Sequence, residues 1–215
     1  PDLFVHLEHA PESVARQLAE VPGVATVHPR IDEPLAAWVP GLARPATGTA
    51  ISLPDDGSVR GLALRRGRPP DPARADEVVV LSSFADAHAL EPGDPIEVVL
   101  AGRRHRLRVA GMVMSPEHVF PIGAGGVLSD RGVLVLWMPR PALAARTGHR
   151  GIFNDVTFTL SQGASTRAAL AGIDRVLATW GGLGAHDRDA QLSHRFVTQE
   201  LEQLEVMATR IPIGF

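Results

Sequence analysis

Short apolar runs separated by glycine and proline constrain this chain more than any other feature of its sequence. Residues 77–81 and 133–138 are compact apolar runs typical of buried strands, and residues 96–100 and 103–114 flank an Ala-Gly turn as the arms of a hairpin would. The 21 glycines and 18 prolines indicate many turns and short elements, and the 45% hydrophobic content excludes disorder of the chain as a whole. The middle of the chain, residues 65–139, is therefore predicted to be rich in strands.

The two flanks of this middle region carry strand–helix units instead. Residues 2–7 and 24–28 are expected strands on either side of a helix over residues 11–20, which makes a βαβ-like unit. Toward the other end, a strand over residues 153–160 precedes a helix with one apolar face. The sequence thus predicts an α+β fold, in which a strand-rich lobe is inserted into a platform that carries both chain ends.

A long helix is predicted from Asp189 to about Arg210. Its apolar positions repeat at alternating steps of four and three residues, which is the narrow seam of a coiled coil rather than the wide face of a globular helix. These seam positions are Val197, Leu201, Leu204, Ala208 and Ile211. The pattern favours a stalk that needs a partner helix along part of its length.

Charge, cysteine content and hydropathy limit the classes of function. The net charge is −3 and all 21 basic residues are arginine, so the basic excess of a nucleic-acid-binding domain is absent. Without cysteine the chain has no disulfide scaffold, thiol nucleophile or Cys-based zinc site. No run is long enough for a membrane span. Because the chain begins at Pro1 without methionine and stops abruptly at Phe215, we expect an excised domain flanked by membrane segments.

The sequence contains no familiar catalytic motif. It has no G-x-S-x-G elbow, no H-E-x-x-H pair and no lysine for a phosphate-binding loop. His6 and His9 straddle a strand end and are not expected to form a site. The closest approach to metal-ligand spacing lies at the predicted start of the long helix, at His186, Asp187, Asp189 and His194. A free-standing extracytoplasmic hydrolase or metal-binding protein that uses these four residues is the alternative to a non-enzymatic domain without cofactor or metal.

Several motifs, taken in order, resemble the extracytoplasmic domain of ABC transporter permeases of the FtsX/MacB-like (type VII) superfamily. They follow one another along nearly the whole chain: Gly67-Arg68-Pro69-Pro70, Glu77-Val78-Val79-Val80, Leu90-x-Pro92-Gly93-Asp94, Val109 through Glu117, Val135 through Pro139, Phe153-Asn154-Asp155-Val156, and Ser193-His194-Arg195-Phe196 through Ile211-Pro212. Each motif is common by itself, and their order and spacing carry the resemblance.

The resemblance implies a porter-like platform with an inserted, β-rich, sabre-like lobe and a stalk helix that continues into a membrane helix. The implied boundaries are residues 1–64 and 139–188 for the platform, 65–138 for the lobe and 189–215 for the stalk. The implied role is non-enzymatic: the domain lies outside the cell membrane and transmits mechanical work, while a separate ABC ATPase hydrolyses ATP. Implied partners are the rest of the permease with its membrane helices, the ATPase, a second copy in a dimer and an extracytoplasmic protein, but no nucleic acid.

Overall fold

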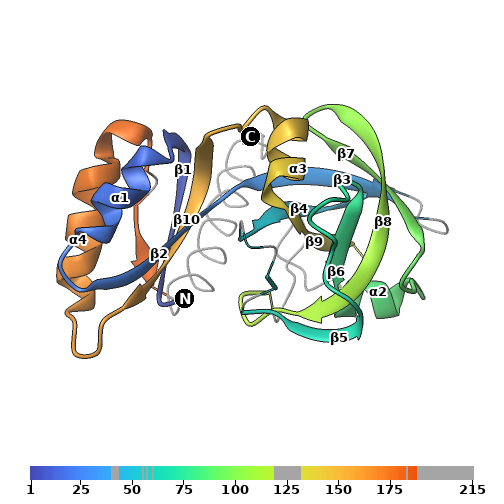
Figure 1. Cartoon of the computed structure of the whole chain (residues 1–215), viewed down its shortest axis with the longest axis horizontal. Coiled ribbons are helices and arrows are strands. Elements are labelled where there is room, and N and C mark those ends of the chain that lie inside the picture. The colour runs from blue at the N-terminus through green and yellow to red at the C-terminus, as the bar shows by residue number, and fades with distance from the viewer. Residues whose placement is uncertain are drawn as a thin grey trace, which may run out of the picture.

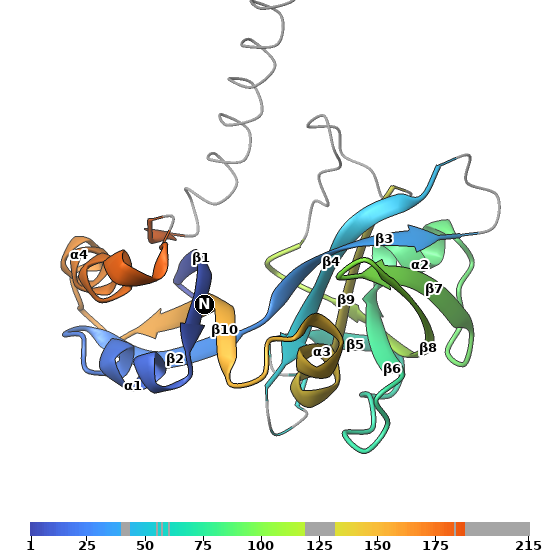
Figure 2. The same cartoon turned by 90° about the horizontal axis from the view of Figure 1, so that it is seen from above.

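Two separate sheets organise the chain. The structure is a computed structural model that describes residues 1–39, 44–54, 56, 58–59, 61–118, 132–182 and 184–187. A four-stranded platform sheet with two helices lies at one end of the long axis, and a curved seven-stranded sheet lies at the other (Figure 1 and Figure 2). The predicted α+β class is confirmed, with more strand than helix. Within the described ranges, no helix is both long enough and apolar enough to cross a bilayer.

The platform is built from two interleaved βαβ units. Its elements are β1 (Leu3–Pro11), α1 (Ser13–Ala19), β2 (Val24–Arg30), β10 (Ile152–Leu160), α4 (Thr166–Leu177), the 3-10 turn η1 (Ala178–Trp180) and β11 (His186–Asp187). The strand order is β11-β1-β10-β2, and each neighbouring pair is antiparallel. Since β10 lies between β1 and β2, and β1 lies between β10 and β11, both units are split βαβ arrangements.

Helices α1 and α4 lie side by side on one face of this sheet (Figure 1). Ser165 caps α4, because its hydroxyl accepts a hydrogen bond from the Ala168 N–H at 3.3 Å. The helices and strands share one apolar core, to which they contribute Leu3, Val5, Leu7, Val14, Leu18, Val156, Phe158, Ile173 and Leu177. The amphipathic pattern of the two flanks thus positions both helices on one side of the platform.

The second sheet closes into a barrel. Its elements are β3 (Asp32–Trp38), β4 (Ala46–Leu53), β5 (Ala63–Gly67), β6 (Glu77–Leu81), α2 (Ser82–Ala87), β7 (Pro95–Leu100), β8 (Arg103–Met114) and β9 (Val133–Pro139), followed by α3 (Arg140–Thr147). The strand order is β5-β8-β6-β9-β4-β3-β7, and β7 also pairs with β8. Six strands therefore form a closed ring, and β5 extends it as an extra strand on β8.

The unbroken apolar character of β6 and β9 follows from burial on both faces. Along β6, Val78 and Val80 belong to the core inside the barrel, while Val79 and Leu81 belong to a second core outside it. Strand β9 alternates in the same way, with Leu136 inside and Trp137 outside. Successive side chains of a strand point to opposite faces. When both faces are buried, both sets of side chains are apolar, and the usual alternation of apolar and polar residues is absent.

The strands over residues 32–53 differ from the sequence prediction. We expected these residues in the platform, but β3 pairs with β4 and β7, and β4 pairs with β9, all within the barrel. The chain passes from the platform sheet to the barrel at Ile31, the single residue between β2 and β3. The predicted boundary at residue 65 was based on the proline-rich segment 69–72, whereas the chain leaves the platform at Ile31, much earlier in the sequence.

The motif Gly67-Arg68-Pro69-Pro70 is explained by its contact with β6. Arg68 donates to both carboxylate oxygens of Glu77, at 2.6 and 2.7 Å, and Glu77 is completely buried. These hydrogen bonds, together with the backbone N–H of Asp71, lower the pKa of Glu77 to about 2. Gly67 is required because its φ is +74° and a Cβ there would lie 2.3 Å from the Ala110 carbonyl oxygen.

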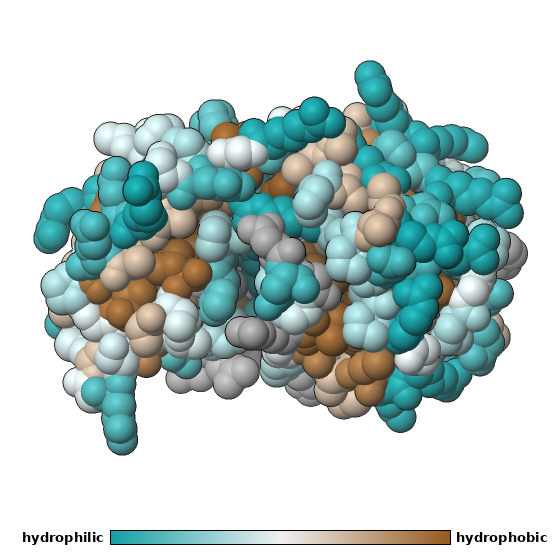
Figure 3. All heavy atoms as spheres, in the orientation of Figure 1, coloured by the Kyte–Doolittle hydropathy of each residue, from teal (hydrophilic) through white to brown (hydrophobic). Residues whose placement is uncertain are grey.

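The surface is mainly hydrophilic on the face that Figure 3 displays, with apolar areas over both the platform and the barrel. Large exposed apolar side chains include Trp38, Leu64 and Met114. Trp38 is partly covered by the guanidinium of Arg104, which lies 4.9 Å from the ring centroid. Isolated apolar side chains of this kind are ordinary on a protein surface.

Candidate functional site

The passage between platform and barrel is the candidate functional site. The chain enters the barrel where β2 runs into β3 and returns through β9, α3 and β10 (Figure 1). Polar side chains from both sheets converge at this passage, and we call them the junction cluster: His6, Arg30, Asp32, Asn154 and Asp155.

Asp155 is the centre of the junction cluster. Register places it between His6 on β1 and Arg30 at the end of β2, directly opposite both. Arg30 Nε donates to Asp155 Oδ1, and His6 Nδ1 lies 2.9 Å from Oδ2. The Asp155 side chain is only 1% exposed, against 15% for Arg30 and 40% for His6. A second Arg30 nitrogen donates to Glu117, which follows β8, at 2.8 Å. Arg30 therefore connects platform and barrel.

Asp32 brings the first barrel strand into the cluster. The Asn154 side chain forms two hydrogen bonds with the Asp32 backbone: its oxygen accepts from the N–H at 2.9 Å, and its amide donates to the C=O at 2.8 Å. The Thr49 hydroxyl donates to the Asp32 carboxylate. Asn154 and Asp155 are neighbours in β10 but contact opposite sides of the passage. Asn154 binds the backbone of the barrel strand β3, and Asp155 contacts side chains of the platform strands.

The return connection is fixed by a buried arginine. Arg140 begins α3 and is only 8% exposed at its side chain. It donates to the carbonyl oxygen of Pro29 at 2.6 Å and to the carboxylate of Glu12 at 3.0 Å, both in the platform. Each connection between the two sheets therefore contains one arginine that contacts the other sheet.

The charges at the junction perturb one another strongly. Burial alone would raise the pKa of Asp155, but the Arg30 charge and the His6 contact outweigh it and lower the pKa to about 2. Burial and the Asp155 carboxylate raise the pKa of Asp32. The close contact with the Asp155 carboxylate raises the pKa of the His6 imidazole. The cluster therefore favours a protonated His6 when no other cation neutralises its two aspartates.

Sequence reasoning did not find this cluster. The sequence predicts no site at His6, which lies near a strand end, and Asp32 and Asp155 are 123 positions apart. One signal was present: Asn154-Asp155 interrupts the apolar alternation of the strand over residues 153–160. A buried charge in the middle of a strand implies a partner from another segment, although the strand by itself does not identify that partner.

The predicted site residues have different outcomes. His186 and Asp187 lie in β11, where they pair with Phe4 and Leu3 of β1, and the His186 ring stacks on Phe4 with centroids 6.0 Å apart. Asp189 and His194, the other two members of that possible metal site, lie outside the described residues. So does the whole predicted stalk with its seam, Val197, Leu201, Leu204, Ala208 and Ile211. The stalk stays a prediction.

Comparisons with known proteins agree with the resemblance seen in the motifs. No protein-family model and no curated protein sequence matches the chain. Among solved structures, the periplasmic region of MacB from Actinobacillus actinomycetemcomitans has 16% identity and a TM-score of 0.55, over 93% of this chain and 92% of that one. The extracellular domain of the noncanonic ABC-type transporter YknZ from Gram-positive bacteria has 14% identity and a TM-score of 0.54, over 86% and 98% of the two chains. The resemblance is therefore confirmed at the level of the fold: this chain has the fold of MacB-like extracytoplasmic domains.

Proposed function

We propose that this chain is the extracytoplasmic domain of an ABC transporter permease and that it performs no catalysis itself. The observation that carries the proposal is the common fold with two extracytoplasmic transporter domains, which extends over most of each chain. A fold by itself is compatible with many functions, but the ordered sequence motifs point independently to the same class. In this role the domain lies outside the cell membrane, and a separate ABC ATPase binds and hydrolyses ATP.

The arrangement of the platform supports a mechanical role. β1 and β11 pair through Leu3 and Asp187, so the first and last described strands of the platform are neighbours at one edge of its sheet. The barrel connects to the platform by the two passages described above. Motion delivered to the platform by membrane helices would reach the barrel through the junction cluster and Arg140. We propose that the domain transmits work in this way, as one copy in a dimeric transporter, to a substrate or protein partner outside the membrane.

Surface labelling in intact cells tests the proposed location. The chain has no cysteine, so a single cysteine at exposed Ala73 gives one reporter in this domain. We expect the full-length Ala73→Cys protein to react with a membrane-impermeant maleimide before cell lysis, after permeabilisation of any outer membrane. Val80→Cys, which is buried inside the barrel, is the matched control and should stay unlabelled until it is denatured. Labelling of Ala73→Cys only after lysis would contradict the proposal.

A substitution in the predicted seam tests coupling. In the complete transporter, Leu204→Asp should reduce the cellular function to near background and uncouple it from ATP hydrolysis. The reason is that a charge in an apolar seam disrupts helix pairing. Gln203→Asp places the same charge one residue away, outside the seam, and should retain activity. The measurement is ATP hydrolysis and cellular function of the assembled transporter at matched expression levels. Normal cellular function of the Leu204→Asp transporter would contradict the prediction of a coupling stalk.

A further inference from the structure

We propose that His6, Asp32 and Asp155 form a binding site for a divalent transition-metal ion of the Zn²⁺ class at the passage between platform and barrel. The proposal does not depend on the permease function, since it concerns what the domain binds by itself. It differs from the sequence-based expectation of a domain without metal, and it uses other residues than the possible site at His186, Asp187, Asp189 and His194.

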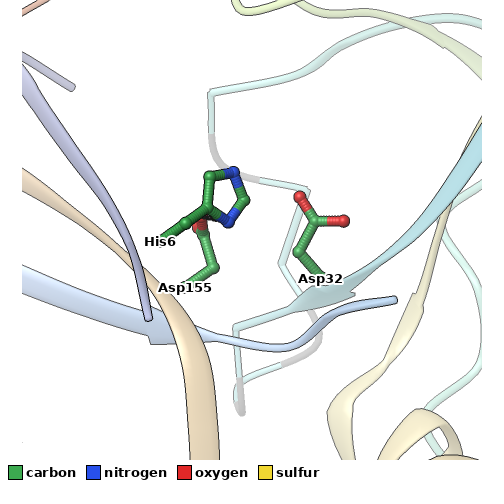
Figure 4. A group of neighbouring side chains, drawn as sticks. All are labelled: His6, Asp32 and Asp155. Carbon is green, nitrogen blue, oxygen red and sulfur yellow. Dashed lines mark ion pairs between the residues drawn. The ribbon is translucent and has the colours of Figure 1, made fainter. Parts of the chain in front are cut away.

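Three strands bring the three side chains together. His6 comes from β1, Asp155 from β10 and Asp32 from β3, and their ligand-type atoms all lie within 4.8 Å of one another. Figure 4 shows His6 and Asp155 on one side and Asp32 facing them from the other. Zinc lies about 2 Å from each ligand atom, so the three side chains would have to move closer together to bind one ion.

One oxygen of the cluster, Asp155 Oδ2, has only the His6 imidazole beside it. Asp155 Oδ2 is completely buried and accepts no hydrogen bond from any described residue. His6 Nδ1 lies 2.9 Å from it, but this contact does not have hydrogen-bond geometry. A buried carboxylate oxygen normally has a hydrogen-bonding partner in the protein, an ordered water or an ion. An ion bound by both Oδ2 and Nδ1 would satisfy the oxygen directly.

The composition of the set indicates the class of ion. One imidazole with two carboxylates suits zinc and similar transition metals, whereas Mg²⁺ and Ca²⁺ prefer oxygen ligands alone. Two aspartates face the single positive charge of Arg30, which also pairs with Glu117. A divalent ion would therefore compensate a local excess of negative charge. Partial exposure of His6 leaves a route for the ion and a position for a bound water.

Neighbouring groups already orient the three side chains. Arg30 holds the other oxygen of Asp155, the Thr49 hydroxyl contacts the Asp32 carboxylate, and Asn154 fixes the Asp32 backbone. Such outer contacts are typical of metal sites, because they hold carboxylates and imidazoles in their ligating orientation. Bound to strands of both sheets, the ion would join the platform to the barrel.

Zinc titration of the isolated domain, without an affinity tag, tests the proposal. The probe is Zn²⁺ alone, followed by calorimetry and thermal melting. We expect one strong site per domain and a Tm increase of about 5 °C or more at a Zn²⁺ concentration near 100 times the Kd. Mg²⁺ at the same concentration should produce no comparable shift.

Two ligand variants and one control test which residues bind the ion. His6→Ala and Asp32→Asn should lose the strong site and the Tm increase, with His6→Gln in reserve if His6→Ala does not fold by circular dichroism. His9→Ala removes an exposed histidine of the same strand and should bind Zn²⁺ like the wild type. Absence of a strong site in the wild type, its retention in a folded ligand variant, or its loss in His9→Ala would each overturn the proposal.

Discussion

Replacement of Arg30 by alanine should lower the free energy of unfolding by about 3–5 kcal/mol at neutral pH, because it leaves the buried Asp155 carboxylate with only the His6 imidazole as a charged partner. The loss should exceed that of an ordinary surface charge, since Asp155 is only 1% exposed and water cannot replace the guanidinium. Urea denaturation of the isolated domain measures the difference. Arg16→Ala, at an exposed position of α1, is the matched control and should change the stability by less than about 0.5 kcal/mol.

The pH dependence of this loss has a definite sign. In the wild type, the pKa of Asp155 is lowered to about 2, so its contribution to stability is present above the unfolded pKa, near 4, and disappears as the pH falls toward 2. In Arg30→Ala the main opposing effect is removed and only His6 still counteracts burial, so the pKa of Asp155 should be higher than in the wild type. Between about pH 2 and pH 4 the variant should therefore gain less stability than the wild type does. The two proteins should differ most at neutral pH and converge as the pH falls toward 2.

A double variant separates the lost charge pair from lost packing. Arg30→Ala combined with Asp155→Asn removes the unpaired charge but keeps the size of the side chain, so it should recover a large part of the stability that Arg30→Ala loses. A single Arg30→Ala variant as stable as Arg16→Ala would contradict the central role of Asp155. So would a stability loss that is the same at every pH.

Local patterns in the sequence were sufficient for most elements of this fold. The apolar runs that became β6 and β9, the hairpin of β7 and β8, and the amphipathic helix α4 all follow from periodicity and turn residues within one segment. The order of the elements was sufficient to predict an insertion, because strand–helix units flank a strand-rich middle. These features depend on neighbours along the chain, which a sequence displays directly.

Features that depend on distant segments were not predicted. The strand of residues 32–38 has an ordinary apolar pattern, and nothing local decides whether it pairs with β2 or with β7. That choice depends on register with β4 and β7, which are formed by residues 46–53 and 95–100. The junction cluster was missed for the same reason, because His6 and Asp155 become neighbours only when β1 pairs with β10.

A glycine in β4 illustrates how strictly those distant pairings are fixed. Gly48 pairs in parallel with Leu134 of β9 and in antiparallel fashion with Leu35 of β3, so it is enclosed on both sides by neighbouring strands. A Cβ at this position would lie 1.7 Å from the carbonyl oxygen of Leu134 and 2.6 Å from its carbonyl carbon. Both are backbone atoms of a central strand and cannot move away without breaking the hydrogen bonds of β9.

Gly48→Ala should therefore cost about 4 kcal/mol or more, a size that single substitutions reach only when they disrupt the core or the backbone. Gly102→Ala is the matched control, because it is the same substitution at a position where no atom lies within 4 Å of the new Cβ. Its cost comes from the positive φ of +75° alone and should be about 1–2 kcal/mol. Urea denaturation followed by tryptophan fluorescence provides both values, and similar costs for the two variants would contradict the enclosed position of Gly48.

The effect of Gly48→Ala should also extend to the junction. The next residue, Thr49, donates its hydroxyl to the Asp32 carboxylate, so any displacement of β4 away from β9 moves the group that orients Asp32. If Gly48→Ala still folds, we expect it to bind Zn²⁺ more weakly than Gly102→Ala, although neither glycine is near a proposed ligand in the sequence. Equal affinities would mean that the Asp32 carboxylate is oriented independently of β4, and that Asn154 alone holds the barrel side of the passage.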